Sequence, residues 1–328
     1  MHFGKILSCI VALSVNPAFA GDIQFGRTCD GSAAAWLGDD RIAVADDEDG
    51  TLWLYGINGG EPERRDLPGL SGDEPDFEGA ARIGDRIYCI GSHGRNAKGK
   101  VQPSRQVIVA TDLDGRIVGT PFKDLLPLLP GADPSEKLGL ADSIGTDGTS
   151  RARAAEAGGL NIEGLAAKPD GSAWIGLRNP RSDDGEAVLI PLDALASVGT
   201  AAPEIRPGKA LRILIDELGV RDLAWSEDLR AFLIIGGTSS AGDDFRLYRW
   251  AGDDSPPQAI MRVEGIGPEA VVPLPGRRTA LLLSDDGDRR VAVAKAECDS
   301  GWRDGTCACK HLVNDGKKSF RGRVVELN

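Results

Sequence analysis

Residues 163–178 read EGLAAKPDGSAWIGLR, and this stretch decides the fold. A short run of small and apolar residues is followed by a Pro-Asp-Gly turn and by a second short run that ends at Arg178. Two short strands joined by a tight turn form an antiparallel hairpin. Working outward, the same shape begins at four other places, which are Ser32, Glu78, Arg221 and Glu269.

Further strand-like segments follow each hairpin. The third segments lie at residues 51–57, 105–113, 186–192, 245–252 and 290–296, and the fourth at 62–68, 116–122, 210–216, 258–265 and 320–327. Four short strands repeated about every 45 residues are typical of a β-propeller. We therefore predict an all-β propeller with five visible blades, six being possible, closed by a strand at 22–26 beside the last blade. A pair of β-sandwiches is the alternative, but it does not explain five similar units.

One interval between repeats is longer than the others. The repeat starts at Glu78 and Glu163 leave room for an insertion at about 122–160, between blades 2 and 3. We expect a short helix at 122–129, and an Ala-rich helix capped by Thr149 that ends at Gly158. With Arg151 and Arg153, this insertion is a candidate lid over the channel.

The composition narrows the class of protein. The 328 residues include 43 Gly and 19 Pro, only 5% are aromatic, and 50 acidic residues outnumber 38 basic ones. The Gly and Pro content argues against a helical bundle, and the apolar content argues against disorder. The acidic balance argues against binding to nucleic acid, which needs a basic surface.

Residues 1–20 have the pattern of a secretory signal peptide. Lys5 precedes an apolar stretch of about ten residues, and Ala18-Phe19-Ala20 is a small-x-small cleavage signal. This stretch is too short to cross a membrane, and no later segment is long enough to form a membrane span. We expect a periplasmic or secreted protein whose residues 21–328 form a single propeller domain.

Export affects how the cysteines are interpreted. Removal of Cys9 with the signal leaves five cysteines, enough for at most two disulfides and one free thiol. Cys298 with Cys307 or Cys309 is expected to staple the loop between them. A metal site that uses Cys307, Cys309 and His311 is the alternative. Cys89 lies in an apolar run and is expected to be buried.

The propeller geometry turns the repeats into a candidate site. The first strand of each blade lines the channel, so the residues that begin these strands meet at one mouth: Ser32, Glu78, Glu163, Arg221 and Glu269. Crowded carboxylates need a proton, a guanidinium or a cation, and Ca²⁺ or Mg²⁺ suits their oxygen atoms. The alternative is that the glutamates are structural clamps that accept hydrogen bonds from backbone N–H groups of neighbouring blades.

The ends of the second strands fall on the same face. They carry Asp46 and Asp47 as further metal candidates, and Asp285-Asp286 has the same ambiguity between a metal site and ordinary turn chemistry. His93 and Glu163 are the catalytic candidates. The candidates for binding a small anionic substrate are Arg95, Asn96, Arg178, Asn179 and Arg221.

Several of these motifs resemble a known family. FEGAAR (77–82), GSHGRN (91–96), NIEGLA (161–166) and GPEA (267–270) are similar to motifs of an exported bacterial propeller-like family described as a domain of unknown function. The resemblance spans most of the mature chain and implies an exported propeller without an assigned activity. The Glu-Gly-Leu element is also similar to that of phytase-like esterase propellers, but this similarity is too short to transfer a catalytic residue.

Three functions remain open from the sequence. The first is a cation-dependent hydrolase of a phosphoester, ester or lactone, in which the glutamates hold Ca²⁺ or Mg²⁺ and His93 moves a proton. The second is a propeller that binds a small anionic ligand or a protein at its charged face without catalysis. The third is a purely structural role for the ring of carboxylates.

Overall fold

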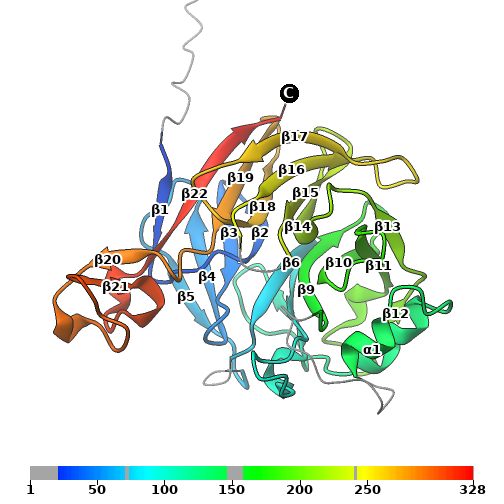
Figure 1. Ribbon diagram of the computed structural model, residues 1–328, viewed down its shortest axis with the longest axis horizontal. Coiled ribbons are helices and arrows are strands. Elements are labelled where there is room, and N and C mark those ends of the chain that lie inside the picture. The colour runs from blue at the N-terminus through cyan, green and yellow to red at the C-terminus, as the bar shows by residue number, and fades with distance from the viewer. Residues whose placement is uncertain (1–20, 71–73, 146–157, 240–241, 328) are drawn as a thin grey trace, which may run out of the picture.

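A computed structural model describes residues 21–70, 74–145, 158–239 and 242–327. Within these residues the strands form five sheets arranged in a ring, together with one small separate sheet (Figure 1). The innermost strands of the five sheets are β2 (Ala33–Gly38), β6 (Phe77–Ile83), β9 (Asn161–Ala167), β14 (Gly219–Ser226) and β18 (Pro268–Leu274). Each of them contacts the next, and β18 contacts β2, so the ring is closed. The protein is a five-bladed β-propeller, as predicted.

Blades 1 and 4 have the expected four strands in sequence order. Blade 1 continues outward from β2 through β3 (Arg41–Ala45), β4 (Thr51–Gly56) and β5 (Glu63–Asp66). Blade 4 continues from β14 through β15 (Ala231–Gly237), β16 (Phe245–Trp250) and β17 (Gln258–Val263).

Blades 2 and 3 are less regular at their outer edges. Blade 2 adds β7 (Arg86–Gly91) and β8 (Ile108–Asp112) to β6, and the predicted fourth strand contributes isolated bridges. Blade 3 adds β10 (Ala173–Asn179) and β11 (Ala187–Asp193) to β9, and both β12 (Arg206–Pro207) and β13 (Leu211–Ile213) pair with β11.

Blade 5 corrects one prediction. Its order is β18, β19 (Thr279–Ser284), β22 (Ser319–Glu326) and β1 (Ile23–Gly26), so the third strand is 319–326 and not 290–296. The segment 290–296 contributes β20 (Arg290–Ala292), which pairs with β21 (Thr306–Ala308) in a lobe at the side of the ring (Figure 1). Val291 and Val293 give this segment a strand-like pattern, but they pack in a small cysteine-rich core of this lobe. The outermost strand is β1, and the predicted closure by the N-terminal strand is confirmed.

The described part of the insertion packs against the ring instead of covering the channel. Phe122 pairs with Ile108 in an isolated bridge, and the predicted helix at 122–129 is replaced by a 3₁₀ turn, η2 (Leu126–Ala132), followed by α1 (Leu140–Ile144). Prolines 127 and 130 favour the short turn over a longer helix. The expected helix with Thr149, and the lid residues Arg151 and Arg153, lie outside the described residues.

Short 3₁₀ turns complete the secondary structure. They are η1 (Pro103–Arg105), η4 (Leu195–Ser197), η5 (Lys295–Glu297), η6 (Cys309–His311) and η7 (Asp315–Lys317). Within the described ranges, no helix is long and apolar enough to cross a membrane.

Close packing at the axis explains the small residues in the inner strands. A Cβ placed on Gly79 would lie 2.7 Å from the backbone nitrogen of Leu165 in the next blade, and one on Gly164 would lie 2.4 Å from Leu223. Real Cβ atoms do not approach other atoms this closely. The glycine that follows the glutamate in blades 2 and 3 is therefore required by the contact between neighbouring blades.

Candidate functional site

Four of the five inner strands carry a β-bulge at the same end. The pairing register shifts at Glu78, Glu163, Arg221 and Glu269, each of which is the extra residue that has no direct partner on the second strand of its blade. A bulge re-aims the side chain of the extra residue and bends the strand. Ser32 directly precedes the first strand of blade 1. The structure therefore brings the predicted ring residues together at one channel mouth. The β-bulges at these positions could not be predicted from the sequence pattern.

Arginines clamp two of these carboxylates. Glu163 is 2% exposed, and it accepts from Arg178 Nη1 at 2.9 Å and contacts Arg221 Nε at 3.0 Å. Arg221 also pairs with Glu269, which belongs to the next blade. Asn161 Nδ2 donates to Glu163 Oε1 at 2.5 Å. The ion-pair network spans blades 3, 4 and 5, so the clamp uses guanidinium groups and not the backbone amides proposed in the structural alternative.

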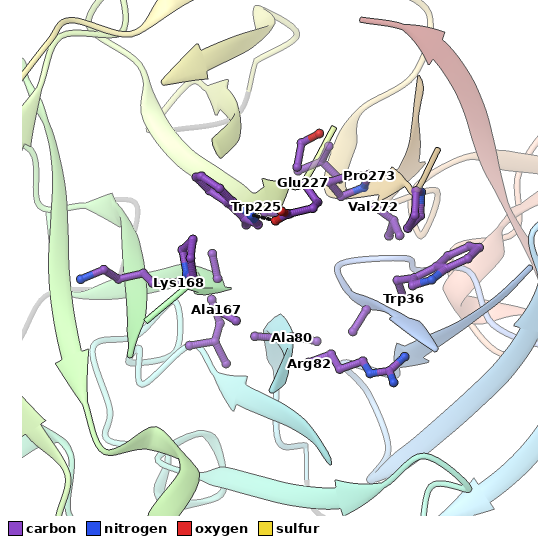
Figure 2. A pocket seen from close by; sticks show the side chains of 18 of the residues that line it. Trp36, Ala80, Arg82, Ala167, Lys168, Trp225, Glu227, Val272 and Pro273 are labelled. Atoms are coloured by element: carbon purple, nitrogen blue, oxygen red, sulfur yellow. Dashed lines mark hydrogen bonds between the residues drawn. The ribbon is translucent and has the colours of Figure 1, made fainter. Parts of the chain in front are cut away.

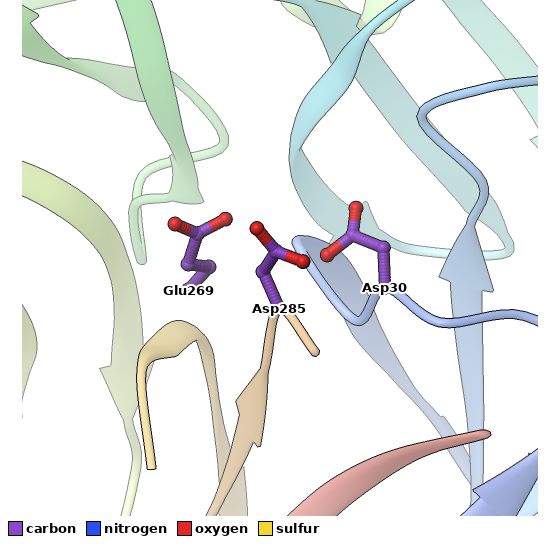
Figure 3. A group of neighbouring side chains, drawn as sticks. All are labelled: Asp30, Glu269 and Asp285. Carbon is purple, nitrogen blue, oxygen red and sulfur yellow. The ribbon is translucent and has the colours of Figure 1, made fainter. Parts of the chain in front are cut away.

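A second group of carboxylates lies beside this network. Oxygen atoms of Asp30, Glu269 and Asp285 all lie within 4.8 Å of one another (Figure 3). Ser32 Oγ lies 2.7 Å from Asp30 Oδ1 and 3.0 Å from Glu269 Oε2. Asp47 joins Asp30 and Asp285 in lining a small cavity of about 70 Å³. Of these residues, Glu269 and Asp47 were predicted metal ligands, and Asp285 was an ambiguous candidate.

The crowding of acids has an electrostatic consequence. Burial raises the pKa of Asp30 well above its ordinary value, and the neighbouring charge of Asp285 adds to this effect. The pKa values of Asp47 and Glu78 are raised well above their ordinary values for the same two reasons, loss of water and nearby carboxylates. Desolvation also raises the pKa of Asp285, although the backbone N–H of Gly287 and the charge of Arg221 oppose it. The mouth therefore holds more negative charge than its arginines neutralise.

Asp46 and Glu78, which were also predicted as metal ligands, differ from each other in their contacts. Asp46 accepts from the indole of Trp53 at 3.0 Å and from the backbone N–H of Glu48 at 3.0 Å, so its oxygens hold its own loop together. Glu78 makes no hydrogen bond or ion pair with another described residue, and it lies in the electrostatic range of Glu163 and Arg221.

The residues of the GSHGRN motif lie away from the acidic cluster. His93 is 3% exposed and lines a separate cavity with Arg95. The Arg95 guanidinium donates to Gly99 O and Ile144 O, both at 3.2 Å. Asn96 accepts from the backbone N–H groups of Lys98 and Lys100 and closes an exposed loop. The predicted catalytic pair of His93 and Glu163 is therefore divided between two sites.

The remaining predicted substrate contacts are placed near the mouth. Arg178 and Arg221 line a cavity of about 590 Å³ between blades 4 and 5, together with Glu269 and Asp285. Arg178 also donates to Thr238 O at 3.2 Å. Asn179 is buried at the end of β10 and donates to Ser239 O at 3.0 Å, so it holds the loop that follows β15 in the next blade.

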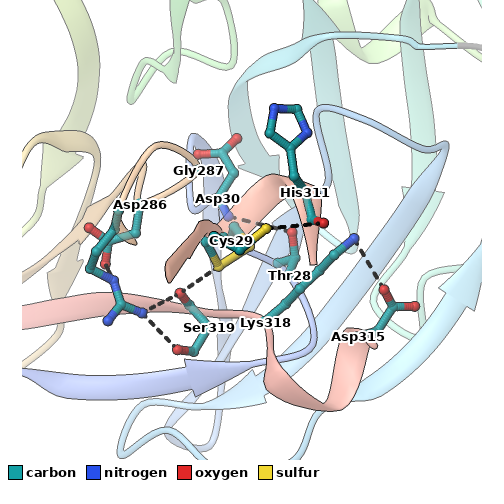
Figure 4. The surroundings of a disulfide bond; sticks show 12 residues. Thr28, Cys29, Asp30, Asp286, Gly287, His311, Asp315, Lys318 and Ser319 are labelled. Atoms are coloured by element: carbon teal, nitrogen blue, oxygen red, sulfur yellow. Dashed lines mark hydrogen bonds and ion pairs between the residues drawn. A yellow bond between two sulfur atoms is a disulfide. The ribbon is translucent and has the colours of Figure 1, made fainter. Parts of the chain in front are cut away.

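Two disulfides form, and one of them fixes the acidic cluster. Cys298 pairs with Cys307, one of the two expected partners, whereas Cys309 pairs with Cys29 across 280 residues. Cys29 directly precedes Asp30, and its carbonyl accepts from Asp286 N at 2.8 Å (Figure 4). The bridge holds Cys29 against the C-terminal lobe, and the hydrogen bond from Asp286 places Asp30 beside the segment that follows β19, next to Asp285. Cys89 is buried and free, as expected, and burial raises the pKa of its thiol to about 12.

The opposite end of the channel carries a cavity that the sequence analysis missed. This cavity of about 530 Å³ is lined by all five inner strands, with Trp36 and Trp225 at its edge (Figure 2). Its polar groups include Lys168 and Glu227, and Trp225 Nε1 donates to Glu227 at 2.8 Å. The sequence contained a signal for this cavity, because two of the five first strands carry a tryptophan, but these residues were interpreted as ordinary strand residues.

Comparison with known proteins finds one family model that part of the chain resembles. Residues 152–279 match the family described as "Protein of unknown function (DUF3616)". The resemblance to a family of unknown function is therefore confirmed over a range that includes the NIEGLA and GPEA motifs. The FEGAAR and GSHGRN motifs lie outside the matched range. No curated protein sequence matches the chain.

Solved structures with a similar chain path include propellers of several kinds. A luciferin-regenerating enzyme is 10% identical with a TM-score of 0.43, over 94% of this chain and 96% of that chain. PQQ-bound aldose sugar dehydrogenase from Streptomyces coelicolor is 13% identical with a TM-score of 0.41, over 94% and 96%. The Dos1 propeller is 12% identical with a TM-score of 0.34, over 80% of this chain and 57% of that chain, so the protein spans just over half of it. Similarity at this level carries no information on activity.

Proposed function

We propose that the protein is an exported propeller that binds a divalent cation at Asp30, Glu269 and Asp285, and that it hydrolyses a small anionic phosphoester, ester or lactone at the same mouth. One observation carries the proposal. Carboxylates from three separate parts of the chain converge within 4.8 Å, in a position fixed by a disulfide and by a β-bulge.

The charge balance supports a cation. The mouth carries the carboxyl groups of Asp30, Asp47, Glu78, Glu163, Glu269 and Asp285, and the cations paired directly with them are Arg178 and Arg221. Burial is the main cause of the raised pKa values of Asp30, Asp47 and Glu78, and the charges of neighbouring carboxylates raise them further. A divalent ion would relieve this repulsion without protonation.

The ligand atoms favour a hard cation. All of the candidate ligands are carboxylate oxygens, and such sites suit Ca²⁺ or Mg²⁺ more than Zn²⁺, which prefers nitrogen and sulfur. We expect Ca²⁺ to bind more tightly, because it accepts irregular arrangements of oxygens from different loops. Asp47 lies close enough to assist, and water would complete the coordination.

The proposed chemistry assigns roles to neighbouring residues. A bound cation would polarise the scissile group and lower the pKa of an attacking water. Glu78 is the candidate proton acceptor, because its carboxyl has a raised pKa and no described partner. Arg178 lines the adjoining cavity and would hold the anionic part of the substrate.

A non-catalytic binding function is the second candidate, and the cavity of about 590 Å³ favours it. Its walls combine Arg178, Arg221 and Arg262 with Glu264 and Glu269, and its volume is in the range of small-molecule sites. The two disulfides are compatible with the exported location that both candidates require.

Calorimetry with Ca²⁺, Mg²⁺, Mn²⁺ and Zn²⁺ tests the cation site. We expect Asp285→Asn to weaken Ca²⁺ binding at least tenfold, and the control Asp254→Asn, an exposed residue of blade 4, to leave it unchanged. Absence of binding by all four ions would contradict the proposal.

Hydrolysis of nitrophenyl phosphates, nitrophenyl esters and small lactones then tests the chemistry. Turnover that requires the cation and is lost in Glu78→Gln would support the hydrolase. Cation binding with a tight anionic ligand that is never turned over would favour the binding function. Sequencing the N-terminus of the protein recovered from the periplasm or the medium tests export, and a mature chain that starts near Gly21 is expected.

A further inference from the structure

A second cavity lies outside the channel, between blade 2, blade 3 and the insertion. Its volume is about 460 Å³, and it shares no lining residue with the acidic mouth. The turn η2 and helix α1 form one side of it, and the GSHGRN loop forms another. This volume is within the usual range for a small-molecule site.

His93 gives the wall of this cavity a defined chemical character. Its Nδ1 lies 2.7 Å from the carbonyl oxygen of Gly91. A carbonyl oxygen only accepts hydrogen bonds, so Nδ1 must carry the proton, and Nε2 of the neutral ring then presents a lone pair. Nε2 is buried and has no hydrogen-bond partner in the described part of the chain. The ring is kept neutral near pH 7, because burial lowers the pKa of His93 to about 4.

The backbone holds this histidine in an unfavourable conformation. Its φ angle is +56°, in the left-handed region that only a few per cent of residues other than Gly adopt, with Asn, Asp and His the most frequent among them. The backbone N–H of His93 bonds to Arg105 O at 3.2 Å, which helps to hold the conformation. A buried acceptor without a donor, on a strained backbone, is the kind of local cost that proteins retain at functional sites.

The other walls are mostly apolar. They are formed by Leu126, Pro127, Pro130, Ile144 and Leu160. Gln106 and Arg95 add polar groups, and Arg95 braces α1 through Ile144 O. An apolar body would fit these walls, and the lone pair of His93 selects for a hydrogen-bond donor.

We propose that this cavity is a second ligand site, for a small uncharged molecule with an apolar body and one hydroxyl group, such as a phenol or a compact alcohol, whose hydroxyl donates to Nε2 of His93. The site is independent of the cation and of the proposed hydrolysis, because it shares no residue with either. A free ammonium group is disfavoured, since it would be desolvated against apolar walls beside a guanidinium.

Nuclear magnetic resonance of protein labelled with ¹⁵N-histidine tests the proposal directly. The full chain has three histidines, so the double variant His2→Asn with His311→Asn leaves His93 as the source of the histidine signals. We expect His93 to show a protonated Nδ1 and an unprotonated Nε2 at pH 7. Addition of p-cresol should shift the Nε2 signal, whereas 4-methylanisole, which has a similar body but no donor, should bind at least tenfold more weakly.

Two variants make the result decisive. His93→Asn keeps a residue that tolerates a positive φ and removes the imidazole, and it should reduce the affinity for p-cresol at least tenfold. Leu126→Trp leaves His93 intact and should block the cavity from its rim, so it tests the site even if the first variant does not fold. Equal affinities for p-cresol and 4-methylanisole, an Nε2 that carries the proton, or unchanged binding to Leu126→Trp would each overturn the proposal.

Discussion

Replacement of Arg221 by Met tests whether the channel mouth is held together by ion pairs. Arg221 is 6% exposed, and its guanidinium pairs with Glu163 and Glu269, two carboxylates from different blades. Met fills a similar space without charge. In the variant, Glu163 keeps Arg178 at 2.9 Å, whereas Glu269 keeps only the Ser32 hydroxyl at 3.0 Å among the described contacts.

The magnitude follows from the burial of the charges that lose their partner. Removal of one member of a buried pair costs about 3–5 kcal/mol, because the other charge stays desolvated. Glu163 retains a second arginine, so we expect the lower end, a loss of about 3 kcal/mol in the free energy of unfolding at pH 8. Arg221 also lowers the pKa values of Glu78 and Asp285, so its removal raises both further. Protonation of an acid whose pKa is raised by folding stabilises the folded protein. The loss of unfolding free energy in Arg221→Met should therefore be smaller at pH 5 than at pH 8.

Urea unfolding followed by tryptophan fluorescence measures this effect, with the disulfides intact. Arg249→Met is the control, because Arg249 is exposed on the same blade, and it should cost less than about 0.5 kcal/mol. The double variant Arg221→Met with Glu163→Gln should be more stable than the sum of the two single losses predicts, by about 1–3 kcal/mol. A loss below about 1 kcal/mol that does not change with pH, or strictly additive losses, would refute the ion-pair reasoning.

Four further results are expected. Loss of Cys29–Cys309, which closes a 280-residue span, should lower the free energy of unfolding by about 5 kcal/mol, and loss of Cys298–Cys307 should lower it by about 3 kcal/mol. Equal losses in urea unfolding of the two Cys→Ala double variants would contradict this. Folding lowers the pKa of His93 to about 4, so the unfolded chain takes up the proton at higher pH than the folded protein does. The free energy of unfolding should therefore fall by up to about 3 kcal/mol as the pH drops from 6.5 to 4, and His93→Asn should remove this part of the pH profile. Calcium affinity measured by calorimetry should fall at least tenfold between pH 7.5 and pH 5, since protons compete for Asp30 and Asp285, whose pKa values are raised; constant affinity would exclude these ligands. Gly79→Ala should lower stability by about 1–3 kcal/mol, because its Cβ would lie 2.7 Å from the backbone of Leu165, and an unchanged urea midpoint would show that the blades can separate.

Local sequence patterns were sufficient to predict most of the ring. The alternation of short apolar runs and turns depends on neighbours in the chain, and it located the strands of blades 1 and 4 and the inner hairpins of all five blades. The same rule failed at 290–296, because Val291 and Val293 pack, partly buried, against the core of the cysteine-rich lobe and not in a blade. Periodicity reports that residues are buried, but it does not report which core receives them.

The candidate site could be predicted where its residues occupy equivalent positions in the repeated strands. It could not be predicted where residues are brought in by contacts with distant parts of the sequence. The positions of Glu78, Glu163, Arg221 and Glu269 at the start of equivalent strands were enough to gather them at one mouth. Asp30 lies in the cluster through contacts with residues far away in the sequence, since Cys29 O accepts from Asp286 N and Cys29 also pairs with Cys309, 280 residues away. The cavity beside His93 could not be predicted for a similar reason, since it is completed by α1 in the insertion.

The closure of blade 5 sets an order of events in biosynthesis. β1 is among the first described segments to be made, yet its partner β22 ends at Glu326, so β1 has no sheet to join until the chain is nearly complete. At about 5–20 residues per second, this delay lasts roughly 15–60 s. For that time Phe25, which is fully buried in the finished ring, stays exposed next to the N-terminus. Until β22 is made, β1 and Phe25 therefore lack the strand that covers them in the finished ring.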